Sequence, residues 1–587
     1  MPRDCPSMLN KTCSFSELQQ DFSWNIPEHY NIGVDVCDKW ADRQPERLAV
    51  IEHLADAEPR RITFGALKEQ SNRLANALQR LGVRGAEPDG MPDRVGVLLP
   101  QSIETAVSHI AITKMGAISI PLFTLFGTEA LLHRLRDSEA KAVITNAEEA
   151  EKILAVQSEL PKLKAVLSVN DRCKSGVLSF HQLCDKESDR FEPATTRADD
   201  PALLIYTSGT TGNPKGALHA HRVLLGHLPG VEVSHDFVDR DKDFFWTPAD
   251  WAWIGGLLDV LMPALHHGVP VLAHRFEKFN PAMAFRLMRD YRIRNVFLPP
   301  TALKLMKQVP EEDIVECSLR SIASGGETLG SELLAWGKRV FGVTINEFYG
   351  QTECNMIVSC CGALESPKAG YMGRGVVGHR VEIIDSERAE ILADGQEGVI
   401  AVRAPDPVMF LGYWNNPKAT EEKFVVVKGE KWLLTGDMGL RDPDGRIRFI
   451  GRDDDVINFA GYRIGPAEIE NCLISHPAVR LAGVVGKPDD IRGQIISAYI
   501  VLADGYAGSA SLAEEIAAHV KSRLAAYEYP RAIRFIEKMP MTTTGKIIRA
   551  SLRKMAEEEG ESASFDDGKG WNSTIGGGIG RNFGCNS

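Results

Sequence analysis

The chain has 587 residues, of which 44% are apolar, 25% charged and 7% aromatic, the mixture of an ordinary folded globular protein. It excludes a disordered, collagen-like or disulfide-stapled chain. The length allows about four domains of ~150 residues, or fewer and larger ones, as is frequent in long α/β enzymes. With 67 Lys and Arg against 79 Asp and Glu the net charge is −12, which predicts neither nucleic acid nor an anionic membrane as a partner.

The cysteines and the apolar runs bear on the cellular compartment. The 11 cysteines contain no Cys-x-x-Cys pair and no zinc-ligand spacing, which indicates reduced thiols. The N-terminus lacks the apolar core of a signal peptide, and its first 20 residues hold as many acidic as basic side chains, unlike a transit peptide. The most apolar stretch, residues 106–123, is interrupted by polar residues, so no membrane span is expected. We expect a cytoplasmic protein.

Short β-branched runs alternate with helical patterns through the first two thirds of the chain. A helix with one apolar face is predicted at residues 67–81, and buried strands are predicted at Arg94–Leu99 and Ala142–Thr145. This alternation is typical of an α/β fold. We expect it to form one large body over residues 1–450, built of several subdomains.

After about Gly451 the pattern changes to that of a small α+β domain, expected over residues 451–556. Pro466 opens a predicted helix, and strands are predicted at 480–485 and 494–502. Ser511 to Glu514 is interpreted as the capping box of a further helix. Residues 557–587 begin with an acidic run and end in a glycine-rich sequence, which predicts a disordered tail.

Residues 206–216, Tyr-Thr-Ser-Gly-Thr-Thr-Gly-Asn-Pro-Lys-Gly, directly follow a predicted strand at Ala202–Ile205. Glycines expose backbone N–H groups, hydroxyls add donors and Lys215 supplies charge, as a loop around a polyphosphate requires. The spacing of a Walker loop is absent, which excludes a P-loop nucleoside triphosphatase. A flexible surface loop stays an alternative. The residues of this loop predicted to bind the nucleotide are Thr207, Ser208, Gly209, Thr210, Thr211, Gly212 and Lys215.

The loop resembles the signature of the adenylate-forming superfamily, which includes acyl-CoA synthetases, luciferases and the adenylation domains of peptide synthetases. Further motifs occur in the order of that family at residues 349–353, 435–437, 451–470 and 540–546. The resemblance runs from about residue 30 to about residue 556. Within the family, the chain most resembles the medium-chain acyl-CoA synthetases. It implies the adenylate-forming enzyme fold, in which the small C-terminal domain is a mobile lid, and it implies ATP, Mg²⁺ and CoA.

The resemblance also implies the residues of the first half-reaction, in which a carboxylate attacks the α-phosphate of ATP to give acyl-AMP and pyrophosphate. Thr352 is expected to contact the α-phosphate and Glu353 to hold Mg²⁺, which prefers oxygen ligands. Lys546 is expected to bridge the attacking carboxylate and the α-phosphate, where its charge stabilises the transition state. Asp437, at a predicted strand end, is expected to bind the ribose hydroxyls, with a helix or turn cap as the alternative.

Two further groups of residues are assigned by the resemblance. The adenine slot is expected to be formed by Gly325, Gly326, Glu327, Glu347, Phe348 and Tyr349. On the small domain, Asp454 is the expected hinge and Arg452 an expected nucleotide contact. Gly461 leaves room for the pantetheine arm of CoA. The other residues expected near CoA or phosphate are Ala460, Tyr462, Arg463, Arg492 and Arg531, with an ordinary surface charge as the alternative for the last two.

Gly350 stands where acetate-type members of the family have a tryptophan that shortens the acyl pocket. The other positions that resemble the acyl wall are Trp253, Ile254, Gly255 and Gly325. Since three of these positions are glycine, we expect a long or wide pocket for a medium-chain, branched or aromatic acid. No basic residue is placed to bind a second carboxylate. The alternatives are a ligase for acetate or propionate, or one that delivers its acyl group to a carrier protein.

Two other patterns are set aside. Gly373 to Gly378 fits G-x-G-x-x-G, but it precedes a predicted strand at Val381–Ile384 instead of a helix, which excludes a dinucleotide site. His219, His221 and the pair His266-His267 lack ligand-spaced partners, so packing roles are expected for them instead of a metal.

Overall fold

The computed structural model describes residues 8–558, apart from 13, 56, 87–89, 171–173, 208–213, 453–454, 460–461, 490–492, 525–527 and 542–545; side chains are also left out at 458–459, 462–463 and 493. Contacts divide the chain into residues 1–449 and 450–587, and each unit is considered by itself. Within the described residues no helix is both long and apolar enough to cross a membrane.

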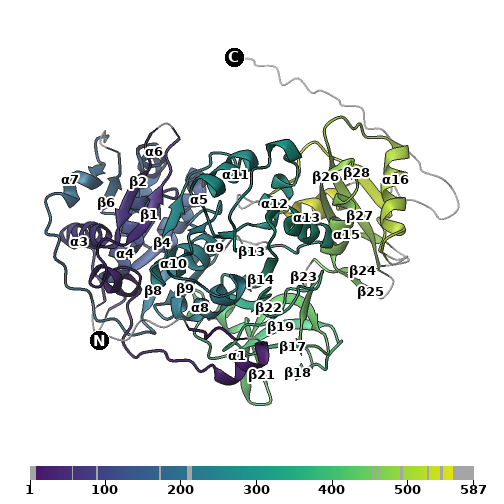
Figure 1. Cartoon of the computed structure of the whole chain (residues 1–587), viewed down its shortest axis with the longest axis horizontal. Helices are drawn as coiled ribbons and strands as arrows, with labels where there is room; N and C mark the ends of the chain where they lie inside the picture. Colours follow the sequence, from purple (N-terminus) through teal and green to yellow (C-terminus); the bar gives the residue numbers. More distant parts are fainter. Residues whose placement is uncertain are drawn as a thin grey trace. The chain divides into compact units, whose positions relative to one another are not determined.

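The first sheet of residues 1–449 has eight strands and a parallel centre (Figure 1). The predicted strands at 94–99 and 142–145 lie side by side in it as β3 and β5, and both are wholly buried. Fully buried strands of this kind are typical of parallel sheets with both faces covered. In order across the sheet, the strands are β20 (Gly412–Tyr413), β9 (Gly216–Ala220), β8 (Pro201–Tyr206), β4 (Ile118–Pro121), β3 (Arg94–Leu98), β5 (Ala142–Thr145), β6 (Ala165–Ser168) and β7 (Leu178–Ser179).

The second sheet has nine strands and also a parallel centre, flanked by antiparallel pairs at both edges. Ligands of open α/β sheets bind beyond the carboxyl ends of the parallel strands. Two of these ends, Gly325 and Gln351, lie within predicted motifs. In order, the strands are β16 (Arg374–Gly375), β15 (Cys354–Ser359), β14 (Ile345–Gln351), β13 (Ser321–Gly325), β12 (Asn295–Phe297), β10 (Phe245–Trp246), β11 (Val271–Ala273), β1 (Leu48–Glu52) and β2 (Arg60–Thr63).

A third, antiparallel sheet completes this unit. Its longest strand, β22, pairs with β19 and β21, and β23 pairs with β22 as well. The strand β17 directly follows the G-x-G-x-x-G pattern, so the exclusion of a dinucleotide-binding helix there is confirmed. The strands are β18 (Glu390–Ile391), β17 (Val381–Asp385), β19 (Gly398–Arg403), β22 (Glu430–Arg441), β21 (Phe424–Val427) and β23 (Ile447–Arg452).

The helices of this unit include two, α4 and α8, that are buried along their whole length. A helix that is apolar on all sides is stable only inside a protein, and α8 packs against β13, β14 and β15. The helix predicted at residues 67–81 is α3, capped by the Thr63 hydroxyl. The longer helices are α1 (Phe15–Asp21), α3 (Phe64–Arg80), α4 (Ile103–Lys114), α5 (Thr128–Asp137), α6 (Ala147–Val156), α7 (Phe180–Cys184), α8 (Val223–Ser234), α10 (Met262–His266), α11 (Pro281–Asp290), α12 (Pro300–Met306), α13 (Ser331–Phe341) and α14 (Pro417–Glu421).

The described residues of the second unit form a five-stranded sheet and three helices, packed around two apolar clusters, as the α+β prediction required. The capping prediction was wrong in its residue: Ser509 caps α16 by accepting from the Leu512 N–H, and Ser511 lies inside the helix. Glu557 and Glu558, expected in the tail, form the last turn of α17, and residues 559–587 lie outside the described part. The elements are β24 (Ile457–Phe459), β25 (Tyr462–Ile464), α15 (Pro466–Ile474), β26 (Val479–Asp489), β27 (Gly493–Leu502), α16 (Ala510–Lys521), β28 (Ala532–Phe535) and α17 (Arg549–Glu558).

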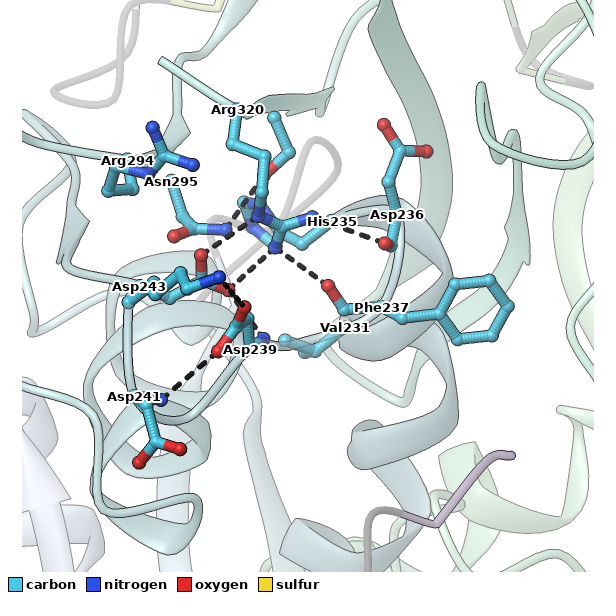
Figure 2. Close-up of polar contacts among 12 residues, drawn as sticks. Val231, His235, Asp236, Phe237, Asp239, Asp241, Asp243, Arg294, Asn295 and Arg320 are labelled. Carbon is cyan, nitrogen blue, oxygen red and sulfur yellow. Dashed lines mark hydrogen bonds and ion pairs between the residues drawn. The ribbon is translucent and has the colours of Figure 1, made fainter. Parts of the chain in front are cut away.

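A buried ion pair fixes the turn that follows α8 (Figure 2). Arg320 binds both carboxylate oxygens of Asp243, at 2.8 and 2.6 Å, and donates to the carbonyls of Asp236 and Phe237. Those two residues have φ of 54° and 65°, a left-handed conformation that is unfavourable for side chains other than glycine. Next in the chain, Ser321 bonds to His235 at 2.8 Å. The cluster therefore ties the end of α8 to the start of β13.

We predict that Arg320→Ala destabilises residues 1–449 by about 3 kcal/mol, because the fully buried Asp243 carboxylate loses its counter-charge. A urea titration followed by tryptophan fluorescence measures this, since every tryptophan except Trp571 lies in that unit. The control is Arg136→Ala, which breaks an exposed pair with Glu159 and should change stability by less than about 0.5 kcal/mol. Equal effects of the two substitutions would contradict the structural role of the buried pair.

Candidate active site

The carboxylate of Asp437 lies within a strand, not at the strand end that the sequence suggested. It belongs to the twelve-residue strand β22 and is 4% exposed. The pairing of β22 with β19 shifts register across residues 434–438, and Gly436 has φ of 76°. An extra residue in a strand forms a bulge that turns a side chain away from the regular ladder, and glycine tolerates the left-handed conformation. The Thr-Gly-Asp motif is therefore a bulge in the middle of a strand.

Two side chains of β14 hold Asp437. The Tyr349 hydroxyl donates to Oδ2 at 2.6 Å, and the Gln351 amide donates to the same oxygen at 2.9 Å. Gln351 also donates to the carbonyl of Thr435 at 3.0 Å. Burial, with the nearby Asp437 charge, raises the pKa of Tyr349 well above its usual range, so the phenol stays a donor. These contacts join the motifs at 349–353 and 435–437 in one site.

Gln351 was missed by the sequence prediction, which named the residues on either side of it. A signal was present, because residues two apart in a strand point to the same face. Tyr349 and Gln351 are such a pair in β14, and both reach Asp437. Strand alternation therefore selects Gln351 once Tyr349 is assigned to the site.

Glu353 follows directly in the chain and is 8% exposed. The hydroxyl of Tyr413 donates to Oε1 of Glu353. The backbone carbonyl of Glu353 accepts from the Phe410 N–H at 2.9 Å. Tyr413 lies sixty residues further along the chain, and no sequence pattern points to it. The ammonium of Lys215 lies 5.1 Å from the centre of the Tyr413 ring. Glu353 and the end of the predicted phosphate loop are thus connected through one tyrosine.

The phosphate loop itself is described only at its two ends. The N–H of Thr207 donates to the carbonyl of Lys215 at 2.9 Å, which closes the loop between β8 and β9. The predicted residues Ser208, Gly209, Thr210, Thr211 and Gly212 lie outside the described residues. Thr352 is half-buried beside Glu353. The roles of all these residues toward phosphate stay predictions.

The donor set at Glu353 fits a magnesium ion that is bound together with phosphate. Mg²⁺ usually takes one or two protein carboxylates and completes its shell with phosphate oxygens and water. In the part of the chain that the structure describes, no group of three or more His, Cys, Asp or Glu side chains could hold a metal by themselves. Among the same residues, Oε2 of Glu353 makes no hydrogen bond, so this oxygen is available as a ligand.

The predicted adenine slot lies at the carboxyl ends of β13 and β14. Gly325 pairs with Phe348, and Gly326 has φ of 99°. Burial raises the pKa of Glu347 to about 8, and its Oε1 accepts from the Leu329 N–H at 3.4 Å. The carboxylate of Glu327 instead contacts Thr301 and Lys304 of α12, at 3.1 and 3.3 Å. Binding of the base by these residues stays a prediction.

The glycines of the predicted acyl wall do not stand beside empty space. A Cβ on Gly325 would lie 2.6 Å from the Phe348 ring, and one on Gly255 would lie 3.0 Å from the Phe297 ring. A Cβ on Gly350 would lie 2.3 Å from Oδ1 of Asn355. Each missing side chain is therefore replaced by a neighbour, and a glycine at these positions is not by itself a sign of a longer pocket. Trp253 and Ile254 lie at the start of the same helical segment as Gly255.

The second unit holds the remaining predicted residues. Lys546 is half-buried and precedes α17, whose first residue, Arg549, binds both oxygens of Glu470 at 2.8 and 2.6 Å. This pair fixes the start of α17 close in sequence to Lys546. The Arg531 guanidinium lies 4.4 Å from the Tyr529 ring. Arg452 is the last residue of β23, and Tyr462 and Arg463 lie in β25; Asp454, Ala460, Gly461 and Arg492 lie outside the described residues.

The four histidines that were not expected to bind a metal are buried, and they either pack in the interior or contact a carboxylate. Burial lowers the pKa of His219 and of His221 to about 3, so both rings are neutral. His266 contacts Asp35 at 2.6 Å, and Nε2 of His267 lies 3.3 Å from Glu232. These contacts are those of interior side chains.

Comparisons with known proteins identify the family of the chain. The family model described as AMP-binding enzyme matches residues 37–414, and the AMP-binding enzyme C-terminal domain matches residues 468–546. The chain is 34% identical to the mitochondrial acyl-coenzyme A synthetase ACSM4 of Rattus norvegicus, over 90% of this chain and 91% of that protein. It is 33% identical to acetyl-coenzyme A synthetase of Bacillus subtilis, over 89% and 90% of the two chains.

Solved structures show the same fold. The anthranilate CoA ligase AuaEII in complex with anthranoyl-AMP superimposes with a TM-score of 0.81 at 28% identity, over 90% of this chain and 98% of that one. A benzoate CoA ligase from Burkholderia xenovorans gives a TM-score of 0.77 at 26% identity, over 89% and 100%. The predicted adenylate-forming fold and the predicted family are therefore confirmed. The chain belongs to the AMP-binding enzyme family.

Proposed function

We propose that the protein is an AMP-forming acyl-CoA synthetase that joins a carboxylic acid to CoA at the expense of ATP. The observation that carries the proposal is the meeting of Tyr349, Gln351 and Asp437, with Glu353 two residues beyond Gln351. These contacts bring Asp437 to the carboxyl end of β14, and ligands of such sheets bind at strand ends. This supports Asp437 as the proposed ribose acceptor and Glu353 as the proposed metal-binding carboxylate. The names of the similar proteins, which are acyl-CoA synthetases and CoA ligases, support the same reaction.

In the first half-reaction a carboxylate oxygen of the acid attacks the α-phosphorus of ATP, and the bond to pyrophosphate breaks. Asp437 accepts hydrogen bonds from the ribose hydroxyls, and Tyr349 and Gln351 keep its carboxylate in place. Thr352 and the loop from Thr207 to Lys215 donate to the phosphates. Glu353 would hold Mg²⁺, which neutralises charge on the phosphates. Lys546 supplies a further positive charge to the transition state.

In the second half-reaction the sulfur of CoA attacks the acyl carbon of the acyl-AMP. The thiol proton is lost, the thioester forms and AMP leaves with the electron pair of the broken anhydride bond. Arg452 is proposed to contact the nucleotide. Residues Ala460 to Arg463, with Arg492 and Arg531, are proposed to lie near CoA or phosphate. A hinge at Asp454 that lets the second unit serve both steps is part of the same proposal, as is a cytoplasmic location.

For the acid we propose a medium-chain, branched or aromatic carboxylate. The names of similar proteins support the aromatic part of this range, because they include an anthranilate and a benzoate ligase. Acetate or propionate is the alternative, favoured by the side chains that occupy the space beside Gly255, Gly325 and Gly350. A carrier protein as acceptor is the other alternative, and it would show as acyl-AMP formation without transfer to CoA.

The acid is identified by a panel that runs from acetate through decanoate and includes isobutyrate and benzoate. We expect AMP and pyrophosphate to be released in a CoA-dependent reaction, with a higher kcat/KM for acids larger than propionate. Coupled assays for AMP and pyrophosphate measure both products. ADP as the product would contradict the reaction, and a clear preference for acetate would contradict the substrate range.

Lys546→Ala should lower the rate of adenylation by about 100-fold or more, because one charge that stabilises the transition state is lost. Acid-dependent exchange of pyrophosphate into ATP measures this step. Thioester formation from supplied acyl-AMP should be largely retained. The matched control is Lys538→Ala, an exposed lysine of the same unit, which should leave both rates unchanged. An equal loss of both half-reactions would refute the assignment of Lys546.

Gln351→Leu should raise the KM for ATP by about tenfold, because the Asp437 carboxylate loses the hydrogen bond from Gln351 and a hydrogen bond to a charged group is worth about 1.5–3 kcal/mol. The KM for the acid should change little, since the lost contact lies on the ribose carboxylate. Initial rates with each substrate varied in turn separate the two constants. A rise in the KM for the acid alone would place Gln351 on the other substrate.

A further inference from the structure

Asp259 is a buried carboxyl group that the proposed reaction does not use. It lies in the π-helical turn Leu257–Leu261, one turn after Gly255, and is 3% exposed. Residues four apart in a helix lie on the same face. A Cβ on Gly255 would accordingly lie 3.5 Å from Oδ2 of Asp259. The carboxyl group therefore borders the residue that was predicted to form the acyl wall.

Asn355 connects this carboxyl group to the second predicted wall residue. Its Nδ2 donates to Oδ1 of Asp259 at 2.7 Å. Its Oδ1 lies 2.3 Å from the position that a Cβ on Gly350 would take. The Asp259–Asn355 pair thus lies between Gly255 and Gly350 and occupies the space that side chains at those positions would fill.

Polar atoms around this pair lack partners. Oδ2 of Asp259 makes no hydrogen bond to any residue that the structure describes. His227, on α8, has its Nε2 3.9 Å from Oδ1 of Asp259, and that nitrogen is buried without a partner in the same part of the chain. Its Nδ1 lies 2.7 Å from the carbonyl of Val223, and burial lowers the pKa of the ring to about 3. The ring is therefore neutral with its proton on Nδ1, and Nε2 is an acceptor.

Leaving the buried Nε2 of His227 without a hydrogen bond is unfavourable in an apolar interior. A buried polar atom without a partner costs about 1–3 kcal/mol. Burial also raises the pKa of Asp259 well above its ordinary value, against the hydrogen bond from Asn355, which lowers it. The raised pKa favours the uncharged carboxyl group, whose carbonyl oxygen still accepts a hydrogen bond, so a neutral hydrogen-bond donor would supply the missing contact.

We propose that the Asp259–Asn355 pair forms a polar wall of the acyl site and selects carboxylic acids that bear a hydroxyl or amino substituent. The inference rests on the proposed function and on the assignment of Gly255 and Gly350 to the acyl wall. Oδ2 of Asp259 accepts the hydrogen bond from the substituent, and Asn355 holds the carboxyl group in place.

The test compares matched acids in the CoA-dependent release of AMP by the full chain. Benzoate is compared with the isomeric hydroxybenzoates and aminobenzoates, and pentanoate with its hydroxylated derivatives. We expect at least one substituted acid to exceed its parent in kcat/KM by about tenfold, the effect of one hydrogen bond. If every parent acid is turned over as well as its derivatives or better, the polar wall is refuted while the synthetase activity stands. If no acid releases AMP, the proposed function itself fails.

Variants of Asp259 identify the residue that is responsible. Asp259→Leu should remove the preference for the substituted acid, a loss of about tenfold in the ratio of kcat/KM between the substituted and the parent acid. Asp259→Asn keeps the size and shape of the side chain. It tests the role of Asp259 if the leucine variant does not fold. It replaces one acceptor by a donor, so an amino substituent should lose more than a hydroxyl group, which can also accept.

The matched control is Glu232→Gln, a carboxyl group of α8 with no exposed surface, which accepts from the backbone N–H groups of Met8 and Leu9. It should leave the ratio between substituted and parent acids unchanged. Thermal melting of each variant separates selectivity from loss of folding. An unchanged ratio in a folded Asp259 variant, or an equal change in the control, would refute the role of Asp259.

Discussion

The candidate site depends on one buried carboxylate. Placing a negative charge where water is excluded is unfavourable unless hydrogen-bond donors replace the lost hydration. Asp437 receives that replacement from Tyr349 and Gln351, both on a strand of the nine-stranded sheet, whereas Asp437 belongs to the antiparallel sheet. The two sheets therefore meet through this group of contacts. Moving either strand by one residue would turn its side chains to the opposite face and leave the charge unpaired.

How much of this could be predicted depended on how local each feature is. The strands β3 and β5, the helix α3 and the order of the motifs follow from contiguous residues, and they were confirmed. The bulge at Asp437 has a local cause in Gly436, yet the strand continues past it because β19 pairs with β22 both before and after the bulge. Sequence patterns close to a motif do not report such pairing, so the strand end was placed too early.

The glycines of the acyl wall show the limit of prediction more clearly. Absence of a side chain at Gly325 or Gly350 suggests space, but interiors are close-packed, and the atoms that fill that space come from other positions. Phe348 belongs to the neighbouring strand and Asn355 to a strand that begins after the motif. The volume of a pocket is therefore set by how neighbouring strands pack, and a single wall residue predicts it poorly.

The helix α8 relates several of these features because it is buried on every side. Its residue His227 lies toward Asp259, and its residue Glu232 accepts from the backbone of Met8 and Leu9. Burial raises the pKa of Glu232 to about 7, although the two N–H groups lower it. A helix with such side chains can be stable only when each polar group meets a partner of fitting charge, whether from the protein, from water or from a substrate. Among the described residues, the Glu232 carboxyl group has hydrogen-bond partners, whereas Nε2 of His227 and Oδ2 of Asp259 have none. The two parts of this helix therefore differ in whether their polar surroundings are paired.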